Sequence, residues 1–308
     1  AVCMMAGTAS LPHVMMRYFT TPSVKSARRS VGWSLFFIFL LYSSAPMLAT
    51  LSKLSLMDPN LATGIIGKSI ADVQALDWYQ NWNQANLMFV SDFNGNGTLE
   101  LNEFFMGGKA VVLATPEIAG LPYVISGLVA AGGMAAAMST ADGLILAIAN
   151  AISHDVYYKI IDPKAETAKR LVVARVLLVV IGFAGATIAA MEIQGILGSV
   201  IWAFDFAMSG LFFPLVLGVW WKRANREGAI AGMALGLISG AGYLIWVRNG
   251  GSGFLGITQL TFGIFGSAVS LVSMVVVSLI TAEPNAATQK MVDEVRVPSG
   301  KSILGKQH

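Results

Sequence analysis

The sequence predicts an all-α polytopic membrane protein, on the basis of three observations. Its 308 residues are 55% hydrophobic and only 12% charged, which is about half the charged share of a soluble domain. Six stretches are long and apolar enough to cross a bilayer core, which takes about 20 residues. Lys and Arg are concentrated in alternate loops, as the positive-inside rule predicts. This composition argues against a cytosolic enzyme, a disordered regulator and a nucleic-acid-binding protein.

The predicted spans divide the chain into four parts. Residues 1–51 hold the end of one membrane segment (1–16) and a complete span (33–51). Residues 52–119 form a polar insert that is too long for a simple connector. Residues 120–281 hold five spans, and 282–308 form a polar tail. The five spans are expected at 120–150, 171–191, 196–221, 228–247 and 257–281.

The basic residues also predict the orientation in the membrane. Sixteen of the 20 Lys and Arg residues fall on one predicted side, and only Lys53, Lys68, Lys109 and Arg248 fall on the other. The insert is therefore expected outside the cytoplasm and the tail inside it. Residues 1–16 lack the order of a signal peptide and look like the end of a longer segment. We therefore expect a C-terminal piece of a longer protein, which needs the missing N-terminal transmembrane helices to fold and function.

A loop in the insert, 92–103, fits the EF-hand calcium pattern. Gly97 stands at the sixth position, where the loop turns sharply, and the flanks 86–90 and 104–106 are expected to be helices. The candidate Ca²⁺ ligands are Asp92, Asn94, Asn96, Thr98 (through its carbonyl), Glu100 and Glu103. The alternative is a polar turn with accidental spacing. A single extracytoplasmic loop is expected to bind Ca²⁺ at about 10⁻⁴ to 10⁻³ M, which favours a structural clamp.

The span 120–150 carries a second candidate site at Ser139, Thr140 and Asp142. The span is over-long and rich in Gly and Ala, as expected of a tilted or broken helix. An ionisable residue inside a membrane indicates function by default, because charge there is costly without partners. Hydroxyl and carboxyl oxygens suit Na⁺ or a proton rather than a transition metal. The alternative is a Ser/Thr pair that bonds to carbonyls of its own helix.

Three stretches resemble the sodium:solute symporter family. Ala136, residues 139–143 and residues 153–157 look like its sodium-site helix. Residues 7–19 with 27–30 are similar to its sixth core helix and the following cytoplasmic turn, and residues 212–223 to the end of its tenth. The likeness covers most of residues 7–230. It is greatest to the cation/acetate symporter branch, some of whose members carry an acidic insert before the sodium-site helix.

The resemblance implies part of a five-plus-five inverted-repeat (APC/LeuT-like) bundle in a bacterial inner membrane, with ion and solute bound beside broken helices. The implied Na⁺ ligands are the Ala136 carbonyl and the Ser139 and Thr140 hydroxyls, completed by a first core helix that this chain does not contain. Asp142 falls where some members place a second cation site. The implied partners are the lipid bilayer and a small organic solute, with a monocarboxylate such as acetate favoured.

Four other polar residues are candidates for the solute cavity. His13 follows Pro12 in the segment similar to the sixth core helix. Trp202, Asp205 and Ser209 share one helix face. The alternative for each is a structural hydrogen bond or a position near a helix end.

The functional prediction is Na⁺-coupled secondary transport by alternating access, and not an enzyme. Proton coupling through Asp142 or Asp205, or an amino acid or sugar as solute, remain alternatives. A membrane-embedded enzyme would need a nucleophilic, His-rich or phosphate-binding constellation, which the sequence lacks. Only the EF-hand-like loop supports a calcium-regulated channel.

Overall fold

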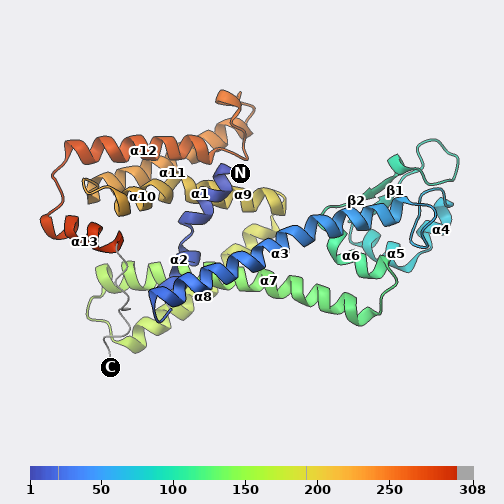
Figure 1. The fold of residues 1–308 in the computed structure, drawn as a ribbon, viewed down its shortest axis with the longest axis horizontal. Helices are drawn as coiled ribbons and strands as arrows, with labels where there is room; N and C mark the ends of the chain where they lie inside the picture. The colour runs from blue at the N-terminus through green and yellow to red at the C-terminus, as the bar shows by residue number, and fades with distance from the viewer. Residues whose placement is uncertain (20, 192, 297–308) are drawn as a thin grey trace. The chain divides into compact units, whose positions relative to one another are not determined.

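The structure, a computed structural model, describes residues 1–19, 21–191 and 193–296 (Figure 1). It divides into two compact units, each described here by itself. One unit comprises residues 29–141, and the other comprises residues 1–28 with the chain from Asp142 onward.

Among these described residues, six helices are long and apolar enough to cross a membrane, which confirms the predicted number of complete spans and a multi-pass membrane protein. Two of them change their winding along the way. Ile196–Trp220 consists of α9 (Ile196–Ala207), a π-helical turn Met208–Phe212 and α10 (Phe213–Trp220). The other five are α3 (Val24–Met57), α7 (Tyr123–Asn150) continued by a π-helical segment (Ala151–Ile161), α8 (Thr167–Ala190), α11 (Arg226–Arg248) and α12 (Gly263–Ile280).

The composition of residues 1–16 suggests the end of one membrane helix. The structure instead shows two helices in this region. They are α1 (Val2–Ser10) and α2 (Pro12–Phe19), separated at Leu11, whose ψ of 119° is extended. The proline ring disfavours the helical conformation of the residue before it. The break is therefore encoded locally by Pro12.

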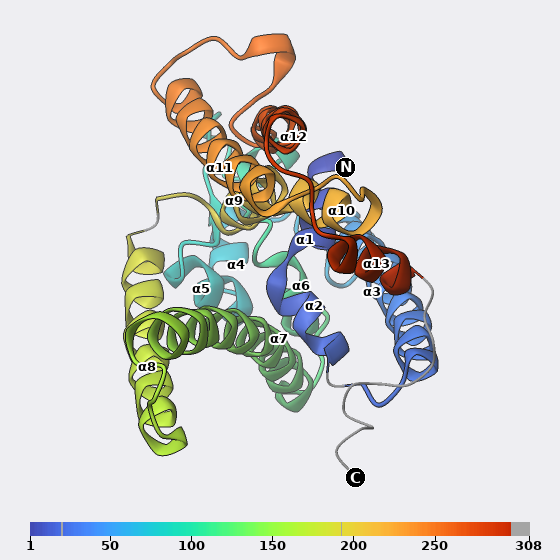
Figure 2. The same ribbon diagram turned by 90° about the vertical axis from the view of Figure 1, so that its left-hand side faces the viewer.

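Helices α11 and α12 form the tightest packing of their unit and lie side by side in both views (Figures 1 and 2). Their contact is lined by four buried glycines of α11 at intervals of four residues: Gly228, Gly232, Gly236 and Gly240. A methyl group at Gly232 would lie 2.9 Å from the Cβ of Met274 on α12. A repeat of small residues allows this close approach of two helices.

The C-terminal helix α13 (Ala286–Arg296) is held against the end of α10. Arg296 donates hydrogen bonds to the carbonyl oxygens of Val219 at 3.0 Å and Trp220 at 2.8 Å, and Lys222 pairs with Asp293 at 2.8 Å. The first part of the predicted polar tail is thus an ordered helix. The rest of that prediction, 297–308, lies outside the described residues.

The insert in the unit 29–141 folds around a small core of its own beyond the end of α3 (Figure 1). Its helices are α4 (Ile70–Gln74), α5 (Asp77–Gln84) and α6 (Val111–Ile118). Apolar residues from each of these elements are buried together, among them Leu56, Val73, Tyr79, Leu99 and Ala114. This core holds the loop 92–103, because Leu99 is fully buried within it.

The predicted helices on either side of that loop are wrong. Residues Met88–Val90 and Phe104–Met106 form an antiparallel pair of strands, β1 and β2, in which Phe89 lies opposite Phe105. Aromatic and β-branched residues favour strands, and the two rings stack at 4.6 Å across the pair. The all-α prediction therefore needs a correction here, because flanks as short as 86–90 and 104–106 are too short to nucleate a helix.

Candidate functional site

The candidate cation ligands Ala136, Ser139 and Thr140 lie on one face of α7. They are spaced by three and four residues on an α-helix that is unbroken from Tyr123 to Asn150, so they are neighbours on its surface. Thr140 Oγ1 donates a hydrogen bond to the carbonyl oxygen of Ala136 at 3.3 Å. This is the bond within the helix that was the alternative to an ion site. It also holds two of the three implied ligand oxygens together.

Asp142 is exposed and lies two residues beyond Thr140, on a different side of α7. The next residue, Gly143, lies against α2. A methyl group at Gly143 would be 3.8 Å from His13 Cβ and 3.6 Å from an Arg17 guanidinium nitrogen. The lack of a side chain at Gly143 therefore lets the candidate histidine approach α7 one residue from Asp142.

Both spans that carry candidate residues change from α to π winding further along the chain, and on the α9 span the change comes close to Asp205. The change begins at Ala151 on the α7 span and at Met208, three residues after Asp205, on the α9 span. Such π segments are found frequently at functional sites. Sequence analysis did not predict them, because no residue type specifies π winding by itself.

Trp202, Asp205 and Ser209 share a face, as predicted, but their surroundings differ. The indole Nε1 of Trp202 donates to the carbonyl oxygen of Gln259 at 2.9 Å, and the Arg248 guanidinium lies 5.4 Å from the centre of its ring. These contacts fasten α9 to the loop between α11 and α12. In this structure Trp202 makes the structural hydrogen bond that was the alternative to a cavity role.

Asp205 and Ser209 are fully buried within their unit. Ser209 Oγ donates to the backbone carbonyl of Asp205 at 2.7 Å and lies beside Gly240 of α11. Among the described residues, neither carboxyl oxygen of Asp205 has a hydrogen-bond partner. Gly263, at the start of α12, lies against this carboxyl group. A buried carboxyl group without a short hydrogen bond is costly, and the polar groups that approach Asp205 are the Cys3 thiol and the backbone amide of Gly263.

The loop 92–103 has the backbone turns of a calcium loop. Gly97 has a φ of 69°, which the turn at the sixth position requires and glycine adopts readily. Asp92 accepts hydrogen bonds from the amides of Gly95 at 2.7 Å and Gly97 at 3.1 Å. Asn94 and Asn96 accept from the amides two residues later, at 2.9 and 2.7 Å. The side chains thus organise the loop from within.

Two glutamates complete the loop. Glu103 is fully buried and accepts from the amides of Phe93 at 2.9 Å and Glu100 at 3.0 Å. Glu100 Oε1 accepts from the side-chain Nδ2 atoms of Asn94 and Asn96 at 3.0 and 3.1 Å. Carboxylate and amide oxygens have two lone pairs each, so these bonds leave acceptor capacity for a cation. In the ranges that the structure covers, no group of three His, Cys, Asp or Glu side chains is arranged to hold a metal ion.

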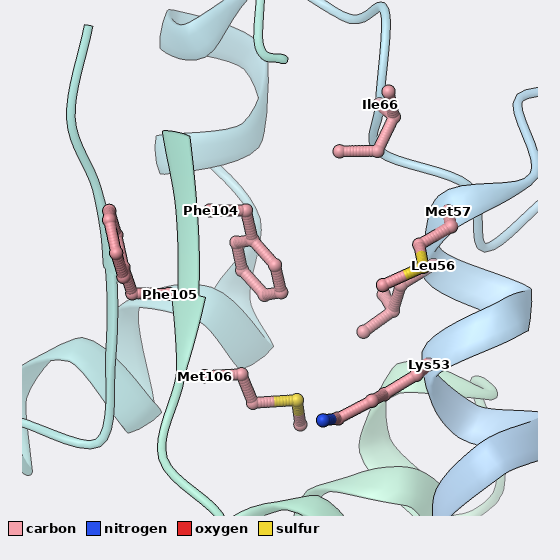
Figure 3. A pocket seen from close by; sticks show the side chains of 7 residues that line it. All are labelled: Lys53, Leu56, Met57, Ile66, Phe104, Phe105 and Met106. Carbon is pink, nitrogen blue, oxygen red and sulfur yellow. The ribbon is translucent and has the colours of Figure 1, made fainter. Parts of the chain in front are cut away.

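Sequence analysis missed a pocket in the insert, shown in Figure 3. Its volume is about 240 Å³, and it is lined by Lys53, Leu56, Met57, Ile66, Phe104, Phe105 and Met106. These residues come from three segments that are distant in sequence, and no local motif links them. The only sequence signal is Lys53 itself, one of the four basic residues predicted outside the cytoplasm.

Comparison with known proteins gives the same assignment as the sequence motifs. The model of the sodium:solute symporter family matches residues 109–236. An uncharacterized symporter of Cupriavidus necator is 40% identical over 96% of this chain and 44% of its own length. A monocarboxylic acid transporter of Corynebacterium glutamicum is 27% identical over 78% of this chain and 36% of its own. The sodium/proline symporter of Escherichia coli is 33% identical over 55% of this chain and 32% of its own.

The chain therefore spans less than half the length of each of these relatives. All three are named as transporters, and none as an enzyme. The matched segment contains α7 with its candidate cation ligands and α9 with Asp205. The chain belongs to the sodium:solute symporter family, as a multi-pass membrane protein.

Proposed function

We propose that this chain is part of a Na⁺-coupled symporter that moves a small organic solute by alternating access, with a monocarboxylate such as acetate as the first candidate. The observation that carries the proposal is the face of α7 on which Ala136, Ser139 and Thr140 bring a carbonyl and two hydroxyl oxygens within one helical turn. Carbonyl and hydroxyl oxygens are neutral, hard ligands of the kind that coordinate Na⁺ in transporters of this architecture.

The hydrogen bond within α7 is compatible with this role. When Thr140 donates its proton to the Ala136 carbonyl, both lone pairs of the hydroxyl oxygen stay free, whereas the carbonyl oxygen also accepts the Thr140 backbone amide of the α-helix and so uses both of its own. A cation beside the helix can therefore be bound by the Thr140 hydroxyl oxygen as it stands, and by the Ala136 carbonyl once the Thr140 hydroxyl releases it. The remaining ligands would come from helices that the relatives possess outside the region they share with this chain.

Uptake by the full gene product that contains this chain tests the proposal. The protein is reconstituted in proteoliposomes, and uptake of labelled acetate is recorded with and without an inward Na⁺ gradient. Ser139→Ala/Thr140→Ala should lower Na⁺-driven uptake at sub-saturating Na⁺ by about tenfold or more, because a hydrogen-bonding group lost from a charged partner costs about 1.5–3 kcal/mol. Uptake that needs no Na⁺ gradient, or that survives the double substitution, contradicts the proposed ion site.

Thr187→Ala on α8 is the matched control. Its hydroxyl donates to the carbonyl of Phe183, four residues earlier, at 2.9 Å, which is the same local arrangement as that of Thr140. Its removal should leave the Na⁺ dependence unchanged. A comparable loss in both variants would mean that the hydroxyls only stabilise their helices.

Competition by unlabelled compounds in the same uptake assay identifies the transported solute. The name of one relative favours a monocarboxylate, and the name of another favours proline. Unlabelled acetate, longer monocarboxylates, proline and a sugar are therefore compared as competitors. Strong competition by proline alone would move the proposal to an amino acid.

Proton coupling is the second candidate, and the burial of Asp205 favours it. Among the described residues this carboxyl group has no hydrogen-bond partner, and such a group is accommodated most easily when it carries a proton. If a pH gradient drives uptake without Na⁺ and Asp205→Asn or Asp142→Asn abolishes it, the carboxyl group replaces the α7 hydroxyls as the coupling site.

We also propose that the loop 92–103 holds a structural Ca²⁺ ion. The side chains of Asp92, Asn94, Asn96 and Glu103 already enclose the loop, with Gly97 at its turn. The strands β1 and β2 flank this loop where an EF-hand has helices, so a large opening of two helices is not expected. A clamp that stabilises the insert fits this geometry better than a channel gate does.

A further inference from the structure

We propose that the pocket of Figure 3 is a second solute site, in which Lys53 binds the carboxylate of a short apolar acid. The site belongs to the insert, outside the membrane spans that carry the α7 ligands. The inference names the same class of solute as the proposed function, but it does not depend on the α7 ion site. The argument rests on the walls of the pocket, its single charge and its size.

Three segments form the walls, and backbone hydrogen bonds hold each of them. The last turns of α3 supply Lys53, Leu56 and Met57. The segment carrying Ile66 is joined to α3, because the amide of Ile65 donates to the Leu56 carbonyl at 2.9 Å. Strand β2 supplies the third wall and is paired with β1. The walls are therefore fixed parts of the insert rather than sides of a loose gap.

Successive side chains of β2 point to opposite sides of the strand, so one side faces the pocket and the other faces outward. Phe104 and Met106 face the space beside α3, whereas Phe105 points to the other side of the strand (Figure 3), where it stacks on Phe89. Phe104 and Met106 also pack against the buried core of the insert. A ligand beside them would lie on an apolar surface whose shape the core maintains.

Lys53 supplies the only charge among the lining residues. Its ammonium group points across the pocket toward the sulfur of Met106 (Figure 3). Within the described residues, neither a hydrogen bond nor an ion pair satisfies it. A cation at the edge of an apolar cavity is complementary to an anion with an apolar tail, because the tail gains burial and the anion a charge-assisted bond.

The size of the pocket selects among such anions. A volume of about 240 Å³ is below the roughly 300–1,000 Å³ of pockets that hold drug-sized molecules. It suits a short monocarboxylate and is too small for the two acyl chains of a phospholipid. We therefore assign the pocket to a free short-chain acid rather than to a lipid.

Photolabelling of the full gene product in liposomes tests the assignment. The probes are a short-chain carboxylic acid that bears an alkyl diazirine and the primary alcohol of the same skeleton. Peptides containing residues 53–57 and 104–106 are then quantified by mass spectrometry. The acid should label these peptides about tenfold more than the alcohol, because only the acid forms the charge-assisted bond.

Lys53→Gln should lower labelling by the acid to the level of the alcohol, and Lys68→Gln, another exposed lysine of the insert, should change nothing. Met106→Trp, which fills the pocket, should abolish labelling by both probes. Equal labelling by acid and alcohol, or acid labelling that survives Lys53→Gln, overturns the proposal. So does competition by anionic phospholipid together with none by unlabelled hexanoate. Uptake is measured separately. Specific labelling of the pocket peptides without Na⁺-driven uptake would contradict the α7 proposal alone. Na⁺-driven uptake without specific labelling would contradict the Lys53 pocket proposal alone.

Discussion

The buried carboxylate of Glu103 accepts a hydrogen bond from the backbone amide of Phe93, ten residues earlier, at 2.9 Å. This bond closes the loop 92–103 at its two ends, and the second oxygen of Glu103 accepts from Glu100. Phe104, the next residue, begins β2 and lines the pocket of Figure 3. The loop and the pocket are thus adjacent parts of one small folded insert.

Glu103→Gln should weaken the insert and remove its response to Ca²⁺. The amide group keeps only one acceptor oxygen, so one buried backbone amide loses its partner at a cost of about 1–3 kcal/mol. Thermal unfolding is measured in Ca²⁺ and in chelator. The unsubstituted protein should gain about 2.7 kcal/mol at a Ca²⁺ concentration 100 times the dissociation constant, and the variant should gain nothing.

Asp72→Asn is the control for this experiment, because Asp72 is an exposed carboxylate of the insert outside the loop. It should retain the full Ca²⁺ response. If the unsubstituted protein is equally stable in Ca²⁺ and in chelator, the calcium proposal is rejected and the loop is a polar turn.

Gly236→Ala should destabilise the contact between α11 and α12. The added methyl group would meet the carbonyl oxygen of Ser209 and lie 2.8 Å from the Cβ of Ser270. Overpacking of this kind costs about 1–3 kcal/mol. Unfolding in detergent, followed by loss of helical circular dichroism, measures the change.

Gly242→Ala lies on the same helix and has open space around the added methyl group. It should be neutral or stabilising by up to about 1 kcal/mol, because alanine favours helix over glycine. If the free energy of unfolding falls in Gly236→Ala and is unchanged or rises in Gly242→Ala, packing at Gly236 is the cause. Equal changes in the two variants would mean that only helix propensity acts.

Asp162→Asn should remove part of the acid sensitivity of the turn between α7 and α8. The Lys169 ammonium group donates to the Asp162 carboxylate at 2.9 Å and lowers the pKa of this carboxyl group below its usual value. A lowered folded-state pKa stabilises the protein above the unfolded value, about 3.9, and this contribution is lost as the pH falls through the folded value. Melting temperatures of the two proteins should therefore differ at pH 6, begin to approach each other below about pH 4, and converge once the pH lies below the lowered pKa of Asp162. A difference that is independent of pH would exclude the ion pair as its source.

Periodicity and composition determined the membrane architecture. Six complete spans and the glycine face of α11 follow from local properties: hydropathy over about 20 residues and a four-residue repeat. The family motifs on α7 are likewise contiguous, so Ser139 and Thr140 were identifiable without a structure. The positions of Gly97 and Glu103 in the loop 92–103 were also set by spacing alone.

Tertiary structure decided the features that depend on residues distant in sequence. The flanks of the loop became strands because Phe89 and Phe105 meet across a pair that neither segment forms alone. The isolation of Asp205 depends on α12, more than 50 residues later, which covers the carboxyl group through Gly263. The Lys53 pocket exists only where α3, the segment at Ile66 and β2 converge. Local sequence specifies the membrane helices, but strand pairing, burial and cavities are set by which surfaces meet when the chain folds.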